Sequence, residues 1–236
     1  MLSGLTRRLV KNANRFRVPA VARSVQRARL TYLSDAKFIS LRDAIRQVRH
    51  EKIPGDFIEY GIALGGSAIY IASELDGDRH FHGYDVFGMI PSPTEEDDEK
   101  SKARYETIRS GRSKGVGGKT YYGYQDDLFD KVSASFKGFG VPVDGERIVF
   151  HKGLFEDTVH FHPESRVALA HLDCDWHDPV KLCLERTIEV LSPGGLMILD
   201  DYNDYGGCRM ATDQFLAGRS DCRLIRTLPH AVVQRS

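Results

Sequence analysis

Four aspartates follow two apolar segments of this sequence, where a soluble chain rarely places charge. Asp173 and Asp175 follow the apolar run 167–170 within the stretch LDCDW, and Asp200 and Asp201 end the later run GLMIL. Like charges repel one another, and removing a carboxylate from water is costly. A partner that neutralises the four charges is therefore expected.

Carboxylates at the ends of neighbouring parallel strands can converge on one point, because such strands lie about 4.8 Å apart. A divalent cation bound there would remove the repulsion between them. Ligands that are all hard oxygen atoms favour Mg²⁺, with Mn²⁺ as a second choice, over zinc or copper. The alternative interpretation is four caps and surface acids that follow strands.

A glycine-rich turn after an earlier strand is the second candidate site. The segment EYGIALGGS, residues 59–67, holds glycines that let the backbone approach a ligand, and a helix beginning near Ser67 offers N–H groups to an anion. The pattern GxGxxG fails, because Ala63 stands at the second glycine. This favours an adenosine-bearing cofactor smaller than a dinucleotide, against the alternative of a tight turn that needs small residues.

Asp85 ends the next strand-like segment of the sequence. An acid at this point of an α/β fold accepts hydrogen bonds from both hydroxyls of a ribose. A turn cap is the alternative interpretation for this residue. Its position after the glycine turn favours the cofactor interpretation.

Other motifs do not point to chemistry. Residues 117–120 read GGKT, but a P-loop needs a glycine where Ser113 stands and a strand before it. The histidine pairs 80/82 and 160/162 lack further ligands at metal-binding spacing. The four cysteines form no CxxC pair, so neither a disulfide framework nor a zinc site is predicted.

Alternating apolar patterns predict the elements that position these residues. Strands are expected at 57–61, 80–87, 147–153, 166–174 and 195–201, and helices at 36–50, from 67, at 126–140, from 178 to 191 and at 208–217. Asp178 is expected as the N-cap of the helix that the segment SPGG ends. Two closing strands, 222–228 and 231–236, suit a terminal antiparallel hairpin. The pattern predicts a doubly wound α/β domain with a mostly parallel sheet, whose ligands bind at the carboxyl ends of the strands.

Two segments fall outside this alternation. Residues 92–125 are polar, glycine-rich and long for a connection, which predicts a lid-like insertion with helix around 95–110. Residues 1–34 hold eight Arg or Lys and no acid, so the domain proper is assigned to 35–236, which carries all 33 acidic residues. The basic arm fits a transit peptide, a helix on an anionic membrane, a partner-binding arm or a solvated helix.

No stretch approaches the ~18 apolar residues of a membrane span, and the first residues lack a continuous apolar signal core. A cytoplasmic protein is therefore expected. Peripheral membrane contact through the basic arm stays open as an alternative.

Taken together, the motifs resemble those of the macrocin O-methyltransferase family, the magnesium-dependent class I methyltransferases that act on sugar hydroxyls of natural products. The stretches that carry the resemblance are PGDFIEYGIALGGSA, GYDVFGMIP, HKGLFEDTV, HLDCDWHDPV and LSPGGLMILDDYNDYGGCRMATDQF. They cover most of residues 54–215 in order. The resemblance implies a single Rossmann-like class I methyltransferase domain, with helices at its N-terminus.

The resemblance also implies that S-adenosylmethionine binds in the glycine turn. The implied cofactor contacts are Glu59 and Gly61 near the methionine moiety, Gly65 and Ser67 in the same turn, Asp85 on the ribose, and the loop Gly153, Leu154 and Phe155 near the adenine. The implied metal ligands are Asp173, Asp200 and Asp201. These assignments are expectations that rest on the resemblance.

Asp175 stands where the family has its proposed general base. The chain departs from the family pattern at Cys174, where a small residue is common, and at His177, where a tyrosine is expected. His177 is a proton acceptor at neutral pH in its own right. Asp175 is the favoured base, with His177 as the alternative.

These parts predict an O-methyltransferase that depends on S-adenosylmethionine and Mg²⁺ and acts on a sugar hydroxyl of a natural product or polysaccharide. A small-molecule or glycan acceptor is expected, a nucleic-acid partner is not, and a homo-oligomer stays open. One alternative is a metal-dependent glycosyltransferase with a D-x-D motif, which explains Asp173 and Asp175 but not the glycine turn. The other is a methyltransferase-like binding module without catalysis.

Overall fold

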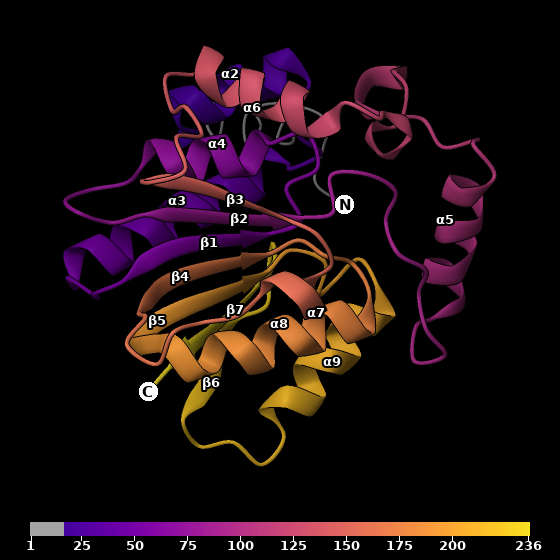
Figure 1. Cartoon of the computed structure of the whole chain (residues 1–236). Coiled ribbons are helices and arrows are strands. Elements are labelled where there is room, and N and C mark those ends of the chain that lie inside the picture. The colour runs from indigo at the N-terminus through magenta and orange to yellow at the C-terminus, as the bar shows by residue number, and fades with distance from the viewer. Residues whose placement is uncertain (1–16) are drawn as a thin grey trace, which may run out of the picture.

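A single seven-stranded sheet lies between two layers of helices in the computed structural model, which describes residues 17 to 236 (Figure 1). The strands are β1 (Asp56–Tyr60), β2 (Phe81–Asp85), β3 (Ile148–Lys152), β4 (Val167–Leu172), β5 (Leu191–Leu199), β6 (Cys222–Arg226) and β7 (Ala231–Arg235), in the order β3-β2-β1-β4-β5-β7-β6. The first five are parallel, and β7 pairs antiparallel with β5 and β6. The predicted doubly wound sheet with a terminal antiparallel hairpin is confirmed.

Helices cover both faces of the sheet. They are α2 (Ala20–Ala28), α3 (Asp35–His50), α4 (Gly66–Ser73), α5 (Glu99–Arg109), α6 (Leu128–Gly138), α7 (Phe155–Thr158), α8 (His177–Val190) and α9 (Gly206–Leu216). Helices α2, α3, α4 and α6 lie on one face, and α7, α8 and α9 lie on the other (Figure 1). Helix α5 stands apart at one end of the sheet, within the predicted insertion.

The register of the central strands brings the acidic motifs together. Every residue of β4 is buried, as its continuous apolar sequence predicts for a strand covered on both faces. Leu172, the last residue of β4, pairs with Tyr60 of β1 on one side and with Leu199 of β5 on the other. The residues after Leu172 and Leu199 therefore leave the sheet side by side, next to the point where the strand order reverses between β1 and β4.

Two predicted boundaries are wrong around α8. Trp176 is the N-cap residue and the helix begins at His177, so Asp178 lies inside the first turn. The backbone N–H of His177 donates to Asp97 of the insertion, a distant partner that local sequence does not show. At the other end, β5 begins at Leu191, directly after α8, and the segment SPGG lies within the strand at a register irregularity.

Residues 17–34 pack into the core of the domain. Ala22 and Val25 of α2 are fully buried, and α2 lies against α4. Gly66 donates its N–H to the carbonyl of Leu30, and a Cβ on Gly66 would collide with that carbonyl. This part of the predicted arm is therefore not a solvated helix, whereas residues 1–16 lie outside the described part of the chain.

Across residues 17–236, no helix is long and apolar enough to cross a membrane. The cytoplasmic location and the membrane contact of the basic arm stay predictions.

The packing of α2 gives a stability prediction. We expect Val25→Ala to lower the free energy of unfolding by about 1 to 3 kcal/mol, because it removes two buried methyl groups and leaves a cavity. Arg27→Ala, at an exposed position of the same helix, should change it by less than ~0.5 kcal/mol. Urea denaturation followed by circular dichroism measures both variants, and equal stability of the two would show that α2 is not part of the folded core.

Candidate active site

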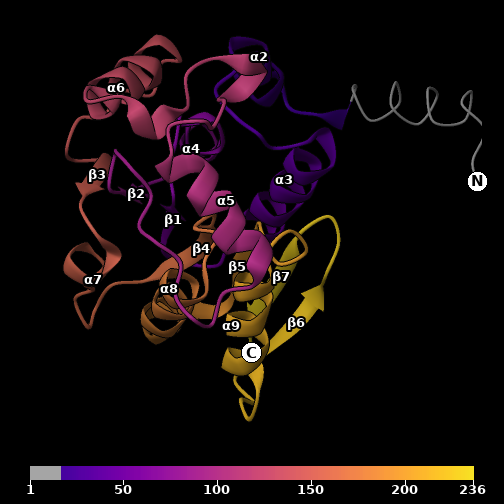
Figure 2. The same ribbon diagram turned by 90° about the vertical axis from the view of Figure 1, so that its right-hand side faces the viewer.

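A cavity of about 550 Å³ opens at the carboxyl ends of the parallel strands. Its floor is formed by Gly61 and Ile62 after β1, Asp85 at the end of β2, Asp173 to Trp176 after β4, and Asp200 and Asp201 after β5. Its walls come from residues 30–33, between α2 and α3, and from the insertion, whose helix α5 crosses in front of the strand ends (Figure 2). The glycine turn and the acidic motifs thus meet in one cavity.

The glycine turn is held in shape by Asp85. One oxygen of this carboxylate, Oδ2, accepts the backbone N–H groups of Ile62 at 2.7 Å and Ala63 at 3.0 Å, and Oδ1 accepts that of Phe87 at 2.5 Å. Burial raises the pKa of Asp85, and the three backbone donors oppose this effect. Asp85 therefore acts as a turn cap in this structure while it also lines the cavity, and its contact with a ribose stays a prediction.

Gly61 is needed where the turn passes closest to the acidic loop. Its φ of 87° lies in the left-handed region, and a Cβ there would collide with the carbonyl oxygen of Asp173. The close approach places the turn after β1 directly against the loop after β4.

The other residues expected at the cofactor divide into two groups. Ser67 and Phe155 line the cavity. Glu59 is fully buried below it, Gly65 caps the start of α4 with a φ of 86°, and Gly153 donates its N–H to the backbone of β2. These three do not line the cavity, so in this structure they shape the site from behind.

Three aspartates form the acidic cluster at the floor. Asp173, Asp175 and Asp201 each offer a carboxylate oxygen, and these oxygens lie within 4.8 Å of one another. Burial, followed by the charges of the neighbouring aspartates, raises the pKa of Asp173 and of Asp175, and burial and Asp200 raise that of Asp201 to about 6. Oδ2 of Asp201 is buried without a hydrogen-bond partner among the described residues. The cluster therefore concentrates negative charge around a buried carboxylate oxygen that accepts no hydrogen bond from residues 17–236.

Asp175 has a strained backbone. Its φ of 61° lies in the left-handed region, which disfavours residues other than glycine. The turn is closed by a 2.7 Å hydrogen bond from the N–H of Trp176 to the carbonyl of Cys174. Strain of this kind is retained where the surrounding structure needs a side chain in one direction, and here the Asp175 side chain faces the cavity.

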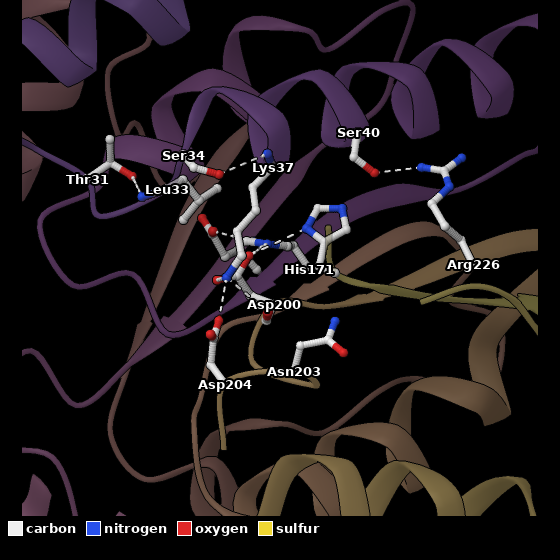
Figure 3. A network of polar contacts seen from close by, with 12 residues as sticks. Thr31, Leu33, Ser34, Lys37, Ser40, His171, Asp200, Asn203, Asp204 and Arg226 are labelled. Carbon is white, nitrogen blue, oxygen red and sulfur yellow. Dashed lines mark hydrogen bonds and ion pairs between the residues drawn. The ribbon is translucent and has the colours of Figure 1, made fainter. Parts of the chain in front are cut away.

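Asp200 lies beside the cluster in a separate charged network (Figure 3). Lys37 of α3 places its Nζ 2.7 Å from Oδ2 of Asp200 and 2.9 Å from Oδ2 of Asp204. Burial would raise the pKa of Asp200, but the neighbouring His171 and His230 side chains and the charge of Lys37 lower it. The predicted metal set of Asp173, Asp200 and Asp201 thus shares two members with the observed cluster.

His171 connects this network to the cofactor side of the cavity. Its Nδ1 lies 2.7 Å from Oε1 of Glu59, and its Nε2 lies 3.7 Å from Oδ1 of Asp200. Burial would lower the pKa of this fully buried imidazole, but Asp200 and Glu59 raise it to about 10. The imidazolium thus offsets part of the acidic charge below the floor.

His177, the alternative base, does not line the cavity. Its Nδ1 lies 2.7 Å from Asp178, its Nε2 lies 2.9 Å from Gln214 of α9, and its ring is almost completely buried. Both ring nitrogens are therefore engaged between α8 and α9.

Two consecutive aspartates fix the insertion over the floor. Asp97 accepts the N–H of His177 at 2.8 Å, and Asp98 accepts the N–H of Gly206 at 3.0 Å. Each donor is the first residue of a helix, where N–H groups lack intrahelical partners and the dipole favours an anion. A Cβ on Gly207 would collide with Asp97. The predicted lid therefore covers the cavity, and its mobility stays a prediction.

Three residues of this site were not predicted from the sequence, namely Lys37, His171 and His230. Lys37 looked like one more polar residue on an amphipathic helix, and no local pattern indicates a contact with Asp200, 163 residues away. His171 interrupts the apolar run of β4. A polar residue at such a buried position was the one sequence signal that indicated a buried polar contact.

The raised pKa of His171 gives a pH prediction. The folded protein keeps a proton on His171 that the unfolded chain, with a pKa near 6.5, loses. This stabilisation is fully present below pH 6.5 and is lost as the pH rises through about 10. Urea denaturation between pH 6.5 and 10, in EDTA, should show the free energy of unfolding falling with pH in the parent protein and falling less steeply in His171→Gln. Equal slopes would contradict the assignment.

Comparisons of this sequence with a family model and with known proteins agree on one family. The sequence model described as Macrocin-O-methyltransferase (TylF) matches residues 8–225. An 8-demethyl-8-(2,3-dimethoxy-alpha-L-rhamnosyl)-tetracenomycin-C 4'-O-methyltransferase of Streptomyces olivaceus is 30% identical over 180 residues, which are 75% of this chain and 63% of that protein. A mycinamicin III 3''-O-methyltransferase of Micromonospora griseorubida is 27% identical over 192 residues, 78% of this chain and 69% of that protein. The chain thus spans slightly less than two thirds of the first relative.

Solved structures share the fold. The O-methyltransferase NovP superposes with a TM-score of 0.73 at 20% identity, over 95% of this chain and 98% of that one. The methyltransferase PaMTH1 of Podospora anserina, described as bound to S-adenosylhomocysteine, gives 0.60 at 16% identity, over 99% and 96%. The predicted Rossmann-like class I methyltransferase fold is confirmed.

Proposed function

Because this chain belongs to the macrocin-O-methyltransferase family, we propose that it transfers a methyl group from S-adenosylmethionine to a sugar hydroxyl, with a bound Mg²⁺. The observation that carries the proposal is the meeting of the glycine turn and the three-aspartate cluster in one cavity. One relative is described as a 4'-O-methyltransferase of a rhamnosyl tetracenomycin, which supports a sugar on a natural product or polysaccharide as the acceptor.

S-adenosylmethionine would bind on the side of the cavity formed by the ends of β1 and β2. Gly61, Ser67, Asp85 and Phe155 line this side and supply backbone N–H groups, a hydroxyl, a carboxylate and an aromatic face. The residues behind them, described above, keep the turn in place. A structurally similar methyltransferase is described as bound to S-adenosylhomocysteine, which supports this cofactor.

The donor set at the floor fits Mg²⁺, or Mn²⁺ in its place. Asp173, Asp200 and Asp201 would hold the ion, since they offer only hard oxygen atoms and Oδ2 of Asp201 is a buried acceptor without a partner. Lys37 binds Oδ2 of Asp200, whereas the nearest contact of Oδ1 is a long one, 3.5 Å to His230. When bound, the ion supplies electrostatic stabilisation for an acceptor oxygen that loses its proton.

Asp175 is the proton acceptor in this proposal. Its carboxylate lines the cavity next to Asp201, and burial with the neighbouring charges raises its pKa, which makes it a stronger base than an exposed aspartate. The hydroxyl proton passes to Asp175, the acceptor oxygen forms a bond to the methyl carbon, and the bond from that carbon to sulfur breaks. S-adenosylhomocysteine leaves, and the protein contributes by holding the two reactants in line. His177 is disfavoured as the base because its ring faces Gln214.

Neither alternative is favoured. A glycosyltransferase that uses Asp173 and Asp175 does not account for the family match or for the glycine turn against Asp173. A binding module without catalysis does not account for the strained Asp175 that faces the cavity.

The metal assignment predicts the behaviour of Asp201→Asn. We expect loss of methyl transfer and of Mg²⁺ binding measured by calorimetry, because the ion loses a charged ligand, while affinity for S-adenosylhomocysteine stays within about threefold of the parent. Asp221→Asn, at a carboxylate paired with Arg219 on the surface, is the control and should retain turnover. Full activity of Asp201→Asn in excess EDTA would refute the assignment.

The base assignment predicts opposite results for Asp175 and His177. We expect Asp175→Asn to lower kcat by at least about a hundredfold, because the variant removes the proton acceptor, with little change in cofactor affinity. His177→Gln should lower kcat far less, since the imidazole does not face the cavity. Single-turnover kinetics separate the methyl-transfer step from product release. A large loss in His177→Gln with near-normal Asp175→Asn would reverse the two roles.

A further inference from the structure

The wall of the cavity formed by the insertion carries a cation that has no anionic partner within residues 17–236. Arg104, in the middle of α5, is half-buried and lines the cavity. Within residues 17–236 its guanidinium makes no hydrogen bond or ion pair, and it lies 5.6 Å from the centre of the Tyr121 ring. None of the Arg104 nitrogens is among the fully buried polar atoms without a hydrogen-bond partner in residues 17–236, so an anion that enters the cavity can reach its N–H donors.

The other cations of α5 differ from Arg104. Arg109 pairs with Glu106 at 2.7 Å, and Lys102 lies 3.5 Å from Glu99. Lys100 donates to the backbone carbonyl of Asp204. Each of these three cations of α5 therefore has a carboxylate or a backbone carbonyl as its partner. Arg104 has neither within residues 17–236.

Aromatic side chains link Arg104 to the reacting end of the cavity. Burial raises the pKa of Tyr32, Tyr121 and Tyr205, and the charge of Arg104 opposes this effect at each of them. Tyr205 also feels the charge of Asp175, and its ring packs edge-on against Trp176 at 5.3 Å. The guanidinium and the proposed base therefore face the same part of the cavity, across rings that suit the apolar face of a sugar.

We propose that Arg104 binds a carboxylate or phosphate group of the acceptor, so that the preferred acceptor is an anionic sugar such as a uronic acid or a sugar phosphate. This inference rests on the proposed function, because it assumes that the acceptor occupies the side of the cavity next to Asp175. A guanidinium makes paired, charge-assisted hydrogen bonds to both groups, and a neutral sugar offers only hydroxyls.

The methionine carboxylate of the cofactor is the other anion that could reach this cavity. Arg104 stands on the insertion and its charge acts on Tyr205, which follows the loop after β5, whereas the cofactor residues stand on the loops after β1 and β2. The position of the guanidinium therefore favours the acceptor. Measurement of cofactor affinity in the same variants distinguishes the two anions.

Calorimetry with three probes tests the proposal. Methyl β-D-glucuronide, glucose 1-phosphate and methyl β-D-glucoside are titrated into the full chain with S-adenosylhomocysteine and Mg²⁺ present. We expect at least one anionic probe to bind roughly tenfold or more tightly than the neutral glucoside, the factor expected for charge-assisted hydrogen bonds to an anion. Arg104→Gln should remove this preference and leave the affinity for the glucoside unchanged.

Two further variants make the test specific. Arg109→Gln, on the exposed side of the same helix, should keep the full preference. Arg104→Lys keeps the charge but not the paired donors, so it should keep part of the preference even if the glutamine variant folds poorly. Circular dichroism and affinity for S-adenosylhomocysteine are measured for all variants.

Equal affinity of the parent protein for charged and neutral probes would overturn the proposal. A loss of S-adenosylhomocysteine affinity in Arg104→Gln as large as the loss of anionic-probe affinity would also overturn it, since Arg104 would then serve the cofactor. These experiments measure ligand binding and do not depend on methyl transfer. Failure of the proposed methyltransferase activity is therefore detected separately, as absence of methyl transfer to any sugar.

Discussion

Repulsion between carboxylates at the ends of β4 and β5 is the constraint on which this structure depends. The pairing of Leu172 with Leu199 makes Asp173 and Asp200 leave the sheet side by side at the floor of the cavity, where their charges are screened less than in bulk water. The chain answers with positive charge from other elements. Lys37 binds Asp200, and the imidazolium of His171 stands between Glu59 and Asp200. These cations act on Asp200, so the cluster of Asp173, Asp175 and Asp201 is left with excess negative charge for a bound cation.

The cavity is completed by segments that do not belong to the sheet. Residues 30–33 form one wall and are held by the hydrogen bond from Gly66 to Leu30, which requires glycine at that position. The insertion forms the other wall and is anchored by Asp97 and Asp98 on the first residues of α8 and α9. An acidic floor therefore faces a wall with a guanidinium that has no anionic partner within residues 17–236, and in our proposal this difference in charge orients the acceptor.

Three features could be predicted from the sequence. They are the order of strands and helices, the terminal hairpin, and the meeting of the glycine turn with the acidic motifs. These features depend on local apolar patterns and on the rule that ligands bind at strand ends. Contacts between distant segments could not be predicted. Trp176 occupies the N-cap position of α8 without a side-chain cap, and Asp97, 80 residues away, accepts the N–H of His177 instead. The same contact helps to bury a histidine that looked available as a base. Lys37 was not expected beside Asp200, because no local signal in the sequence indicates this contact.

The most direct test of the proposed metal and cofactor sites is a crystal structure of the full chain with S-adenosylhomocysteine and Mn²⁺. Anomalous diffraction would locate the ion. We expect one strong anomalous peak at the floor of the cavity, bound by oxygens of Asp173, Asp200 and Asp201, with the sulfur of S-adenosylhomocysteine facing Asp175. The proposed metal site would be contradicted if the cavity bound the nucleoside while the aspartates stayed without an ion. An ion bound elsewhere in the chain would contradict it as well.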